Sequence, residues 1–272
     1  QHKGSVLFDV RVGKWRVWDG SRWANDSTGK VMRLAHKTAR SILVEASKAA
    51  DKTDMSDLTK WALRSQSRER LQAMIDIARY LEPLVIEPKQ WDRDGWLFNC
   101  LNGTINLKTG ELYKHKRDQC ITRRSPIAYD PDAVSEIWDR CLNDALDDAD
   151  AIAFLQRASG YSLTADYSEE KLFLVLGPEA TGKSTVMEAL RAAMGDYAVT
   201  SDFDAFIKRQ GDPGIRNDIA RLAGSRMVCA SESEDGKHLA EAVVKRLTGG
   251  DTITARFMRQ EFFEFEPTFK IW

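Results

Sequence analysis

The sequence predicts an α/β protein in which a mixed α+β domain precedes a second domain with an α/β core. Strand-and-turn patterns followed by long helical periodicities indicate the first domain. A short apolar run that leads into a glycine-rich loop and then a helix-prone stretch indicates the second. With 272 residues, 43% of them hydrophobic and 30% charged, the chain has the size and composition of a globular protein with two domains.

The net charge of -1 conceals a difference between the two halves. Residues 1–130 contain 24 Lys and Arg against 16 Asp and Glu, whereas residues 131–272 contain 16 against 25. Separate domains with separate partners would explain this split, and so would two surfaces that attract each other. Charge counts leave both explanations open.

Several classes of protein do not fit the sequence. No apolar run approaches the ~20 residues that cross a bilayer, so we expect no membrane span. The N-terminus lacks the pattern of a secretory signal and an initiator Met, so Gln1 is expected to follow an internal cut. The four cysteines form no CxxC pair, and with the four histidines they give no zinc-ligand spacing. Reduced cysteines and a cytoplasmic location are expected.

The first elements read as strands with a turn. Residues 10–12 and 15–18 alternate, and Asp19-Gly20 supplies turn chemistry before Trp23. A cluster of tryptophans at Trp15, Trp18 and Trp23 favours a small hairpin core, with stacking on nucleic-acid bases as the alternative.

Helical and strand patterns alternate after this hairpin. Helices are predicted at residues 32–50 and 55–80, and prolines end the second of them. Residues 96–113 form a compact β unit with turns at Asn102-Gly103 and Thr109-Gly110. A further helix is predicted from residue 134 to residue 158, with Gly160 as its stop. The acids Asp144, Asp147, Asp148 and Asp150 are interpreted as a solvated loop rather than a metal site.

The strongest motif follows the apolar run at residues 171–176. Its sequence, GPEATGKS at residues 177–184, satisfies the pattern GxxxxGK[ST]. A helix-prone stretch at residues 185–194 comes next, and Gly195 is its expected stop. The motif therefore lies between a strand and a helix, as a phosphate-binding loop requires.

The chemistry of this motif predicts ATP and Mg²⁺ as cofactors. Glycines let successive backbone N–H groups turn toward phosphate oxygens, and a helix N-terminus favours the same anion. Lys183 is expected to reach the β- and γ-phosphates, and the Ser184 hydroxyl to complete the Mg²⁺ shell. The predicted nucleotide-binding residues are Gly177, Pro178, Glu179, Ala180, Thr181, Gly182, Lys183, Ser184 and Thr185.

An ATPase of this type also needs an acid at the end of a neighbouring strand. The run RMVCASE at residues 226–232 supplies one. Glu232 is the candidate for holding Mg²⁺ and aligning the attacking water, with Glu234 and Asp235 as alternatives.

A hairpin is predicted near the end of the chain. The segment KRLTGGDTITAR at residues 245–256 contains a tight turn, and residues 252–255 and 261–265 are the expected arms around 258–260. Basic residues on such a hairpin suit a phosphate backbone. Ordinary solvated arginines would explain the spacing equally well.

These three elements, in this order, resemble superfamily 3 helicases, most closely the primase–helicase family of phages, plasmids and poxvirus-type viruses. The matching segments are GPEATGKST, RMVCASESEDG, and KRLTGGDTITAR followed by FEFEPTFKIW. Upstream, WDGSRW and LNGTINLKTGEL resemble that family's helicase-associated N-terminal domain. The resemblance implies a helicase-associated domain at residues 1–131 and an ATPase core at residues 132–272.

The resemblance also implies an AAA+-like core that forms a hexameric ring, with ATP bound between subunits. The family's hairpin grips single-stranded DNA in the central channel, which maps onto Lys245, Arg256 and Arg259. A primase domain is expected before Gln1, and the bacterial host cytosol is the expected compartment.

Two departures from the family's pattern affect the expected activity. Many relatives carry paired acids at the second motif, whereas Ser231 precedes Glu232 here. The chain also stops at Trp272, before the family's polar sensor residue and arginine finger. This fragment is therefore expected to bind nucleotide better than it hydrolyses it.

Two other functions remain open. A P-loop kinase for a small molecule would share the loop but should carry an arginine-rich lid, and residues 197–217 contain only Arg209 and Arg216. A non-catalytic module for nucleotide binding, DNA binding and oligomerisation would fit the basic first half. The leading prediction is an ATP-dependent motor that moves along single-stranded DNA.

Overall fold

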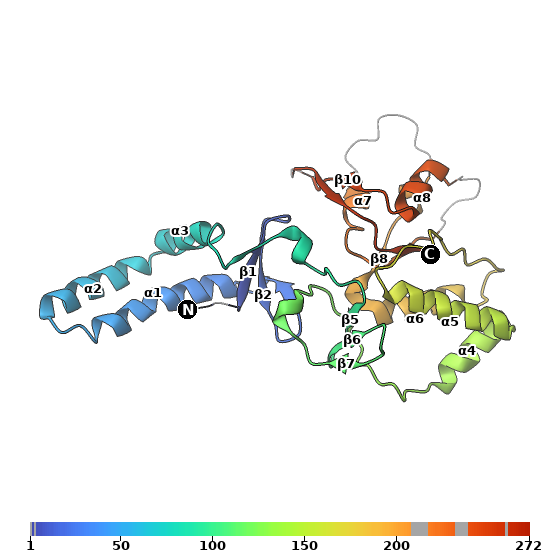
Figure 1. The fold of residues 1–272 in the computed structure, drawn as a ribbon, viewed down its shortest axis with the longest axis horizontal. Helices are drawn as coiled ribbons and strands as arrows, with labels where there is room; N and C mark the ends of the chain where they lie inside the picture. Colours follow the sequence, from blue (N-terminus) through green and yellow to red (C-terminus); the bar gives the residue numbers. More distant parts are fainter. Residues whose placement is uncertain (1, 3, 208–216, 232–238, 259–260) are drawn as a thin grey trace. The chain divides into compact units, whose positions relative to one another are not determined.

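The computed structural model describes residues 2, 4–207, 217–231, 239–258 and 261–272 (Figure 1). The chain forms two compact units. The first contains Gln1–Arg93 and Lys116–Thr122, and the second contains Asp94–His115 and Arg123–Trp272. The boundary between these units does not fall at residue 131, because residues 94–115 pack with the C-terminal part of the chain. The domain boundary at residue 131 stays a prediction.

In its described part, the first unit joins a small sheet to three α-helices. The sheet has the order β3-β2-β1-β4, with β4 parallel to β1 and the other pairs antiparallel. Helices α1 and α2 pack along each other, and α3 also packs on α1 (Figure 1). The elements are β1 (Val6–Asp9), β2 (Lys14–Trp18), β3 (Trp23–Asn25), α1 (Lys30–Ala46), α2 (Lys52–Ser65), α3 (Arg68–Ala78) and β4 (Val85–Ile86).

Two expectations for this unit are wrong. Residues 10–12 form the turn between β1 and β2 rather than a strand, since Gly13 takes a left-handed φ of 63° to reverse the chain. The long helix expected at residues 55–80 is two helices. Ser67 separates them, because its extended backbone starts α3 and its hydroxyl accepts a hydrogen bond from the Arg70 N–H.

The tryptophans form the core of the hairpin, as predicted. Trp23 is only 2% exposed and packs edge-to-face on Trp18 and Trp91, with ring centroids 5.7 and 6.1 Å apart. Its indole N–H donates to the carbonyl of Arg117 at 2.9 Å. A ring that is almost fully buried and hydrogen-bonded at its polar edge is an anchor for packing, so Trp23 is not accessible to a base.

The start of α1 depends on one carboxylate. Asp26 accepts hydrogen bonds from the Lys30 and Val31 N–H groups, each at 2.8 Å. Desolvation of the carboxylate opposes its ionisation, but these and further backbone hydrogen bonds outweigh it and lower the pKa of Asp26. Asp26 therefore satisfies orphan donors at the helix N-terminus in its charged form.

We expect Asp26→Ala to lower the free energy of unfolding of the first unit by about 1 kcal/mol, the usual cost of a lost helix cap. The folded pKa lies below the unfolded one, so the contribution is complete above about pH 4 and is lost as the pH falls further. Urea unfolding of both proteins at several pH values measures it. Asp26→Asn, which keeps an acceptor, is the control. A difference between Asp26→Ala and wild type that stayed constant from pH 6 to pH 3 would contradict this role for the charge.

The second unit contains three small sheets and five α-helices among its described residues. The sheets are the antiparallel β5-β6-β7, the antiparallel hairpin β10-β11 and the parallel β12-β9-β8. The predicted β unit and the predicted hairpin are both confirmed. The elements are β5 (Leu97–Asn99), β6 (Thr104–Asn106), β7 (Leu112–Tyr113), α4 (Glu136–Leu146), α5 (Ala149–Leu163), α6 (Lys183–Met194), β8 (Ala198–Thr200), α7 (Asn217–Ala220), β9 (Met227–Cys229), α8 (Glu241–Thr248), β10 (Ile253–Ala255), β11 (Phe263–Phe265) and β12 (Lys270–Ile271).

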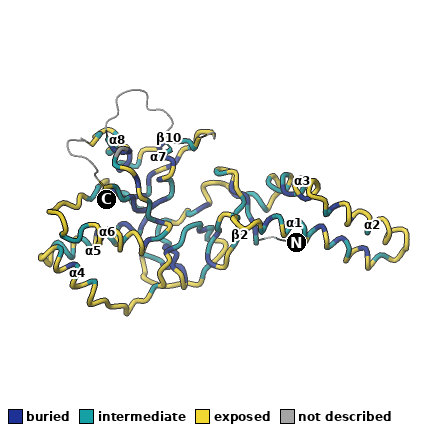
Figure 2. Tube along the Cα trace, turned by 180° about the vertical axis from the view of Figure 1, so that it is seen from behind, coloured by how far each residue is buried: buried dark blue, intermediate teal, exposed yellow. Residues whose placement is uncertain are grey.

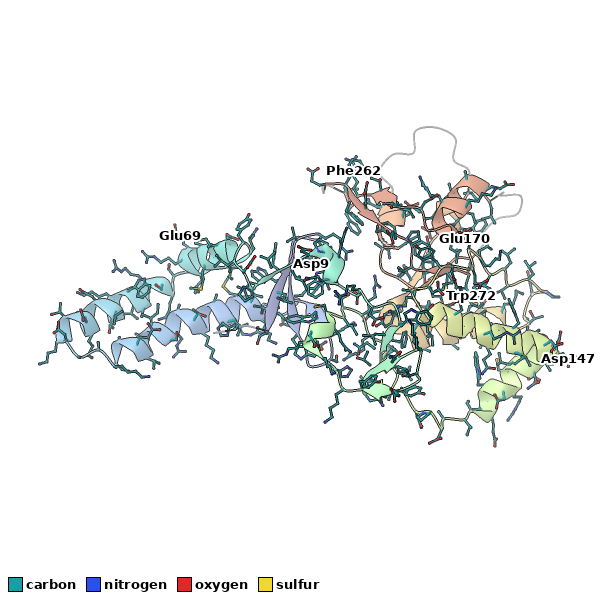
Figure 3. The ribbon with its side chains drawn as sticks, viewed as in Figure 1. Asp9, Glu69, Asp147, Glu170, Phe262 and Trp272 are labelled. Carbon is teal, nitrogen blue, oxygen red and sulfur yellow. The ribbon has the colours of Figure 1, made fainter. Side chains whose placement is uncertain are left out.

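The helix predicted at residues 134–158 is also two helices. Asp147 ends α4 with a left-handed φ of 44°, and Asp148 caps α5 by accepting from the Asp150 N–H. Asp147 lies where the two helices meet (Figure 3). Gly160 does not stop the helix, because α5 continues through it to Leu163. The predicted acidic loop is therefore found only in part: Asp147 and Asp148 form the turn between the helices, whereas Asp144 lies on α4 and Asp150 on α5. All four side chains are exposed.

The parallel sheet has an order that differs from the chain order. Met227 of β9 pairs with Ala198 of β8 on one side and Lys270 of β12 on the other. On the far side of β12, Leu172 forms a parallel bridge to Ile271. The order is thus Leu172, β12, β9, β8. The strand predicted at residues 171–176 is confirmed only at this bridge.

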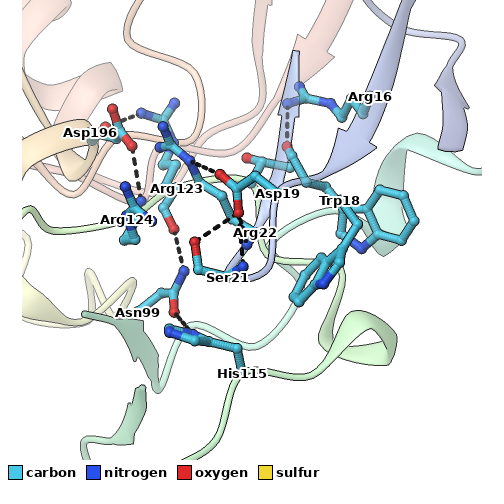
Figure 4. Close-up of polar contacts among 12 residues, drawn as sticks. Arg16, Trp18, Asp19, Ser21, Arg22, Asn99, His115, Arg123, Arg124 and Asp196 are labelled. Carbon is cyan, nitrogen blue, oxygen red and sulfur yellow. Dashed lines mark hydrogen bonds and ion pairs between the residues drawn. The ribbon is translucent and has the colours of Figure 1, made fainter. Parts of the chain in front are cut away.

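A buried asparagine ties the β5-β6-β7 sheet to the segment that follows it (Figure 4). The Asn99 side chain donates to the Arg123 carbonyl at 3.1 Å and accepts from the Thr104 hydroxyl at 3.1 Å. His115 contacts the same Asn99 oxygen at 2.9 Å. Asn99 is fully buried, so these bonds replace water that it has lost.

Candidate functional site

The glycine-rich loop connects Leu172 to α6. Gly182 immediately precedes the helix with a left-handed φ of 82°, a conformation that suits glycine. Ala180 takes a left-handed φ of 59°, which is strained for a residue with a Cβ. The loop thus turns sharply twice within four residues before the helix begins at Lys183.

Lys183 lies across this loop. Its ammonium donates to the carbonyl of Gly177 at 2.7 Å, to the carbonyl of Pro178 and to the Thr181 hydroxyl at 3.3 Å. The Thr181 hydroxyl in turn donates to the Pro178 carbonyl at 2.9 Å. A cation is therefore held over the loop by neutral acceptors, so its charge remains available to an anion.

The N-terminus of α6 has no side-chain cap. The helical bonds begin with the Val186 N–H to the Gly182 carbonyl at 3.0 Å, so the preceding amides have no partner inside the helix. Ser184 and Thr185 are exposed in this first turn. A cradle of free amides beside a lysine fits a phosphate group. The Ser184 hydroxyl is an oxygen ligand of the kind that Mg²⁺ prefers.

A cavity of about 530 Å³ adjoins the loop. Gly177, Thr181 and Lys183 form its polar edge, and α4, α5 and the segment after Leu172 supply apolar side chains such as Leu146 and Phe154. Its volume is in the range of small-ligand sites. Only the polar edge of this cavity carries groups that suit a phosphate.

The sheet directs the loop and the described start of the second motif, residues 226–231, toward one edge. The bridge at Leu172, β12 and β9 are all parallel, so the chain leaves Leu172 and β9 on the same side. Ligands of open parallel sheets bind beyond the carboxyl ends of the strands. The strand predicted before Glu232 is confirmed as β9, but Glu232, Glu234 and Asp235 themselves lie outside the described residues.

The predicted DNA-binding residues fall on different elements. Lys245 lies on α8, exposed, 3.9 Å from the carboxylate of Glu241. Arg256 follows β10 and places its guanidinium over the Phe262 ring, 4.5 Å from the centroid. Arg259, at the expected tip, lies outside the described residues. The base of the hairpin is anchored by buried Ile253 and Phe265.

A buried lysine in this unit is not evident from the sequence. Lys270 of β12 is 1% exposed, and its ammonium donates to the Thr164 carbonyl at 2.6 Å and lies 4.3 Å from the centre of the Tyr161 ring. Burial, and then the neighbouring charge of Arg226, lower the pKa of Lys270 to about 7, against a smaller opposing effect of Asp166. Its only sequence signal is a position between Phe269 and Ile271 in a strand.

A two-unit α/β chain with a glycine-rich loop at the edge of a parallel sheet is the class of protein that these features define. Residues 1–147 match the family described as "D5 N terminal like". The match covers more than half of the chain, so the chain belongs to this family.

One relative extends the similarity beyond that segment. The chain is 27% identical over 184 residues to the protein described as "Putative helicase L207/L206" from Acanthamoeba polyphaga mimivirus. The alignment covers 66% of this chain and 19% of the relative, so the chain spans about a fifth of that relative's length.

Among the helices that the structure describes, none is both long enough and apolar enough to cross a membrane.

Proposed function

We propose that this chain is part of an ATP-dependent DNA helicase of the superfamily 3 primase–helicase type, which couples ATP hydrolysis to movement on single-stranded DNA. One observation carries the proposal: a glycine-rich loop, crossed by Lys183, enters an uncapped helix at the carboxyl edge of a parallel sheet. Membership of the D5 N terminal like family and the name of the viral relative support the same conclusion.

The residues divide the work as follows. The amides at the start of α6 bind phosphate oxygens, and Lys183 neutralises their charge. Ser184 and Glu232 would hold Mg²⁺, which supplies electrostatic stabilisation of the phosphates when bound. Glu232 aligns the attacking water. Lys245, Arg256 and Arg259 contact the DNA backbone, and six copies of the full protein form a ring.

The test is nucleotide binding by this chain and ATP turnover by the full protein, each with and without single-stranded DNA. Binding by this chain, together with DNA-stimulated turnover by the full protein, is the expected result. Turnover by the full protein that DNA does not stimulate would reduce the proposal to an ATPase of another task. Phosphate transfer to a nucleoside monophosphate would instead favour a kinase.

A further inference from the structure

Helix α1 carries basic side chains along the face opposite the one that packs in the core of the first unit. The exposed residues Arg33, Lys37 and Arg40 follow one another at spacings of four and three, which places them in one row on a helix. We call these three residues the basic stripe. The half-buried Lys30 begins the same row, but its ammonium donates to the Trp18 carbonyl at 2.9 Å.

The opposite face of α1 is committed to packing. Its buried residues recur at helical spacing and contact the first unit's core, and α2 and α3 pack along the helix there (Figure 1, Figure 2). The members of this face are Val31, Ala35, Ala39, Ile42 and Ala46. The basic stripe therefore faces away from the helices that cover α1.

No acid balances the basic stripe. Glu45 is the single acidic residue of α1, and within the described part of the chain none of the three basic side chains forms an ion pair. Among the residues that the structure describes, the Arg33 guanidinium donates to the carbonyl and hydroxyl of Thr28, at 2.6 and 3.2 Å. By contrast, α2 mixes its basic residues with acids, and Lys60 lies 3.3 Å from Asp57.

Helix stability does not explain this arrangement. A cation in the first turn, such as Arg33, opposes the helix dipole, which favours anions there. Like charges at these spacings also repel one another. The row rises about 10 Å from Arg33 to Arg40 at 1.5 Å per residue, which is the rise over about four successive phosphates of one duplex strand at 3.4 Å per step.

We infer that the basic stripe of α1 binds the phosphate backbone of DNA, as a contact separate from the β10-β11 hairpin and independent of nucleotide. This contact goes beyond the proposed motor function and does not rest on it. The contact recognises the charge and spacing of the phosphates, so it should have no preference for DNA sequence.

The test measures DNA affinity as a function of salt concentration, without nucleotide. The variants are the triple Arg33→Gln/Lys37→Gln/Arg40→Gln and the double Lys37→Gln/Arg40→Gln, which keeps the bonds of Arg33 to Thr28. Losing three phosphate contacts should lower the slope of log K against log salt by about 2.7 on a duplex or about 2.1 on a single strand. At 0.1 M salt this weakens binding about 500-fold on the duplex or about 100-fold on the single strand. A 30-base-pair duplex and a 30-nucleotide thymidine strand separate the two forms of DNA.

The matched control removes the same charge from α2, as Lys52→Gln/Lys60→Gln/Arg64→Gln. All three of these residues are exposed. The inference predicts a much smaller change in slope for this control, with circular dichroism showing both triples folded. Equal changes in the two triples, or an unchanged slope on both DNA probes, would overturn it. Failure of this inference can be distinguished from failure of the proposed motor function, because Lys183→Ala should leave the slopes of log K against log salt unchanged.

Discussion

Lys183→Ala should weaken the binding of Mg-ATP by about 10- to 100-fold, because a hydrogen bond to a charged group contributes roughly 1.5–3 kcal/mol. The ammonium already lies over the loop, held by the Gly177 and Pro178 carbonyls, so it needs little rearrangement to meet a phosphate. Isothermal titration calorimetry with ATP and Mg²⁺ measures the change directly.

Two further variants make this result specific. Lys171→Ala removes an exposed lysine that precedes the same loop, so it is the matched control and should leave affinity unchanged. Lys183→Arg keeps the charge, which separates loss of charge from collapse of the loop. If Lys183→Ala binds Mg-ATP as tightly as wild type while its melting temperature is also unchanged, the loop is not a nucleotide site and the motor proposal fails with it.

The second large effect is expected in the stability of the second unit. Lys270 has a folded pKa of about 7, well below that of about 10.4 for an unfolded lysine. Between these values the unfolded state binds more protons, so the free energy of unfolding rises with pH by up to about 1.4 kcal/mol per unit. The full rise from pH 7 to pH 10 is roughly 4 kcal/mol by the same relation.

Lys270→Met should remove this rise. The methionine fills a similar buried volume without a proton to lose, at the cost of leaving the Thr164 carbonyl without its donor. Urea unfolding at pH 7 and pH 9.5 gives the comparison, with the exposed Lys245→Met as control. A wild-type protein that is equally stable at the two pH values would show that Lys270 stays charged in the fold.

The local parts of the candidate site were predictable from sequence. The glycine pattern and the helix-prone stretch predict a helix that starts at residue 185, two residues after the actual start of α6, and they predict its end at Gly195. Both ends depend on the conformation of neighbouring residues, which local sequence can indicate. The hairpin arms were predictable too, since their alternation has the period of a strand and buries every second residue. The role of Glu232 stays a prediction.

Other features depend on residues that are distant in sequence. A lysine within a strand reads as a surface residue, and only the fold places Thr164 beside Lys270. The helix breaks at Ser67 and Asp147 depend on caps that compete with an unbroken apolar period. β1 was missed because its strand pairs on both sides, with β2 and β4, so its short run does not alternate.

The position of β12 has a consequence for synthesis on the ribosome. β12 is the last strand along this sequence, yet it lies between β9 and the Leu172 bridge. Until residues 270–272 leave the exit tunnel, β9 keeps one open edge and the segment leading into the loop has no sheet neighbour. Open strand edges and exposed apolar surface are what chaperones recognise and what aggregates join. The nascent second unit therefore completes its sheet late. In the first unit, by contrast, most of the strands and helices that pack together have been synthesised much earlier.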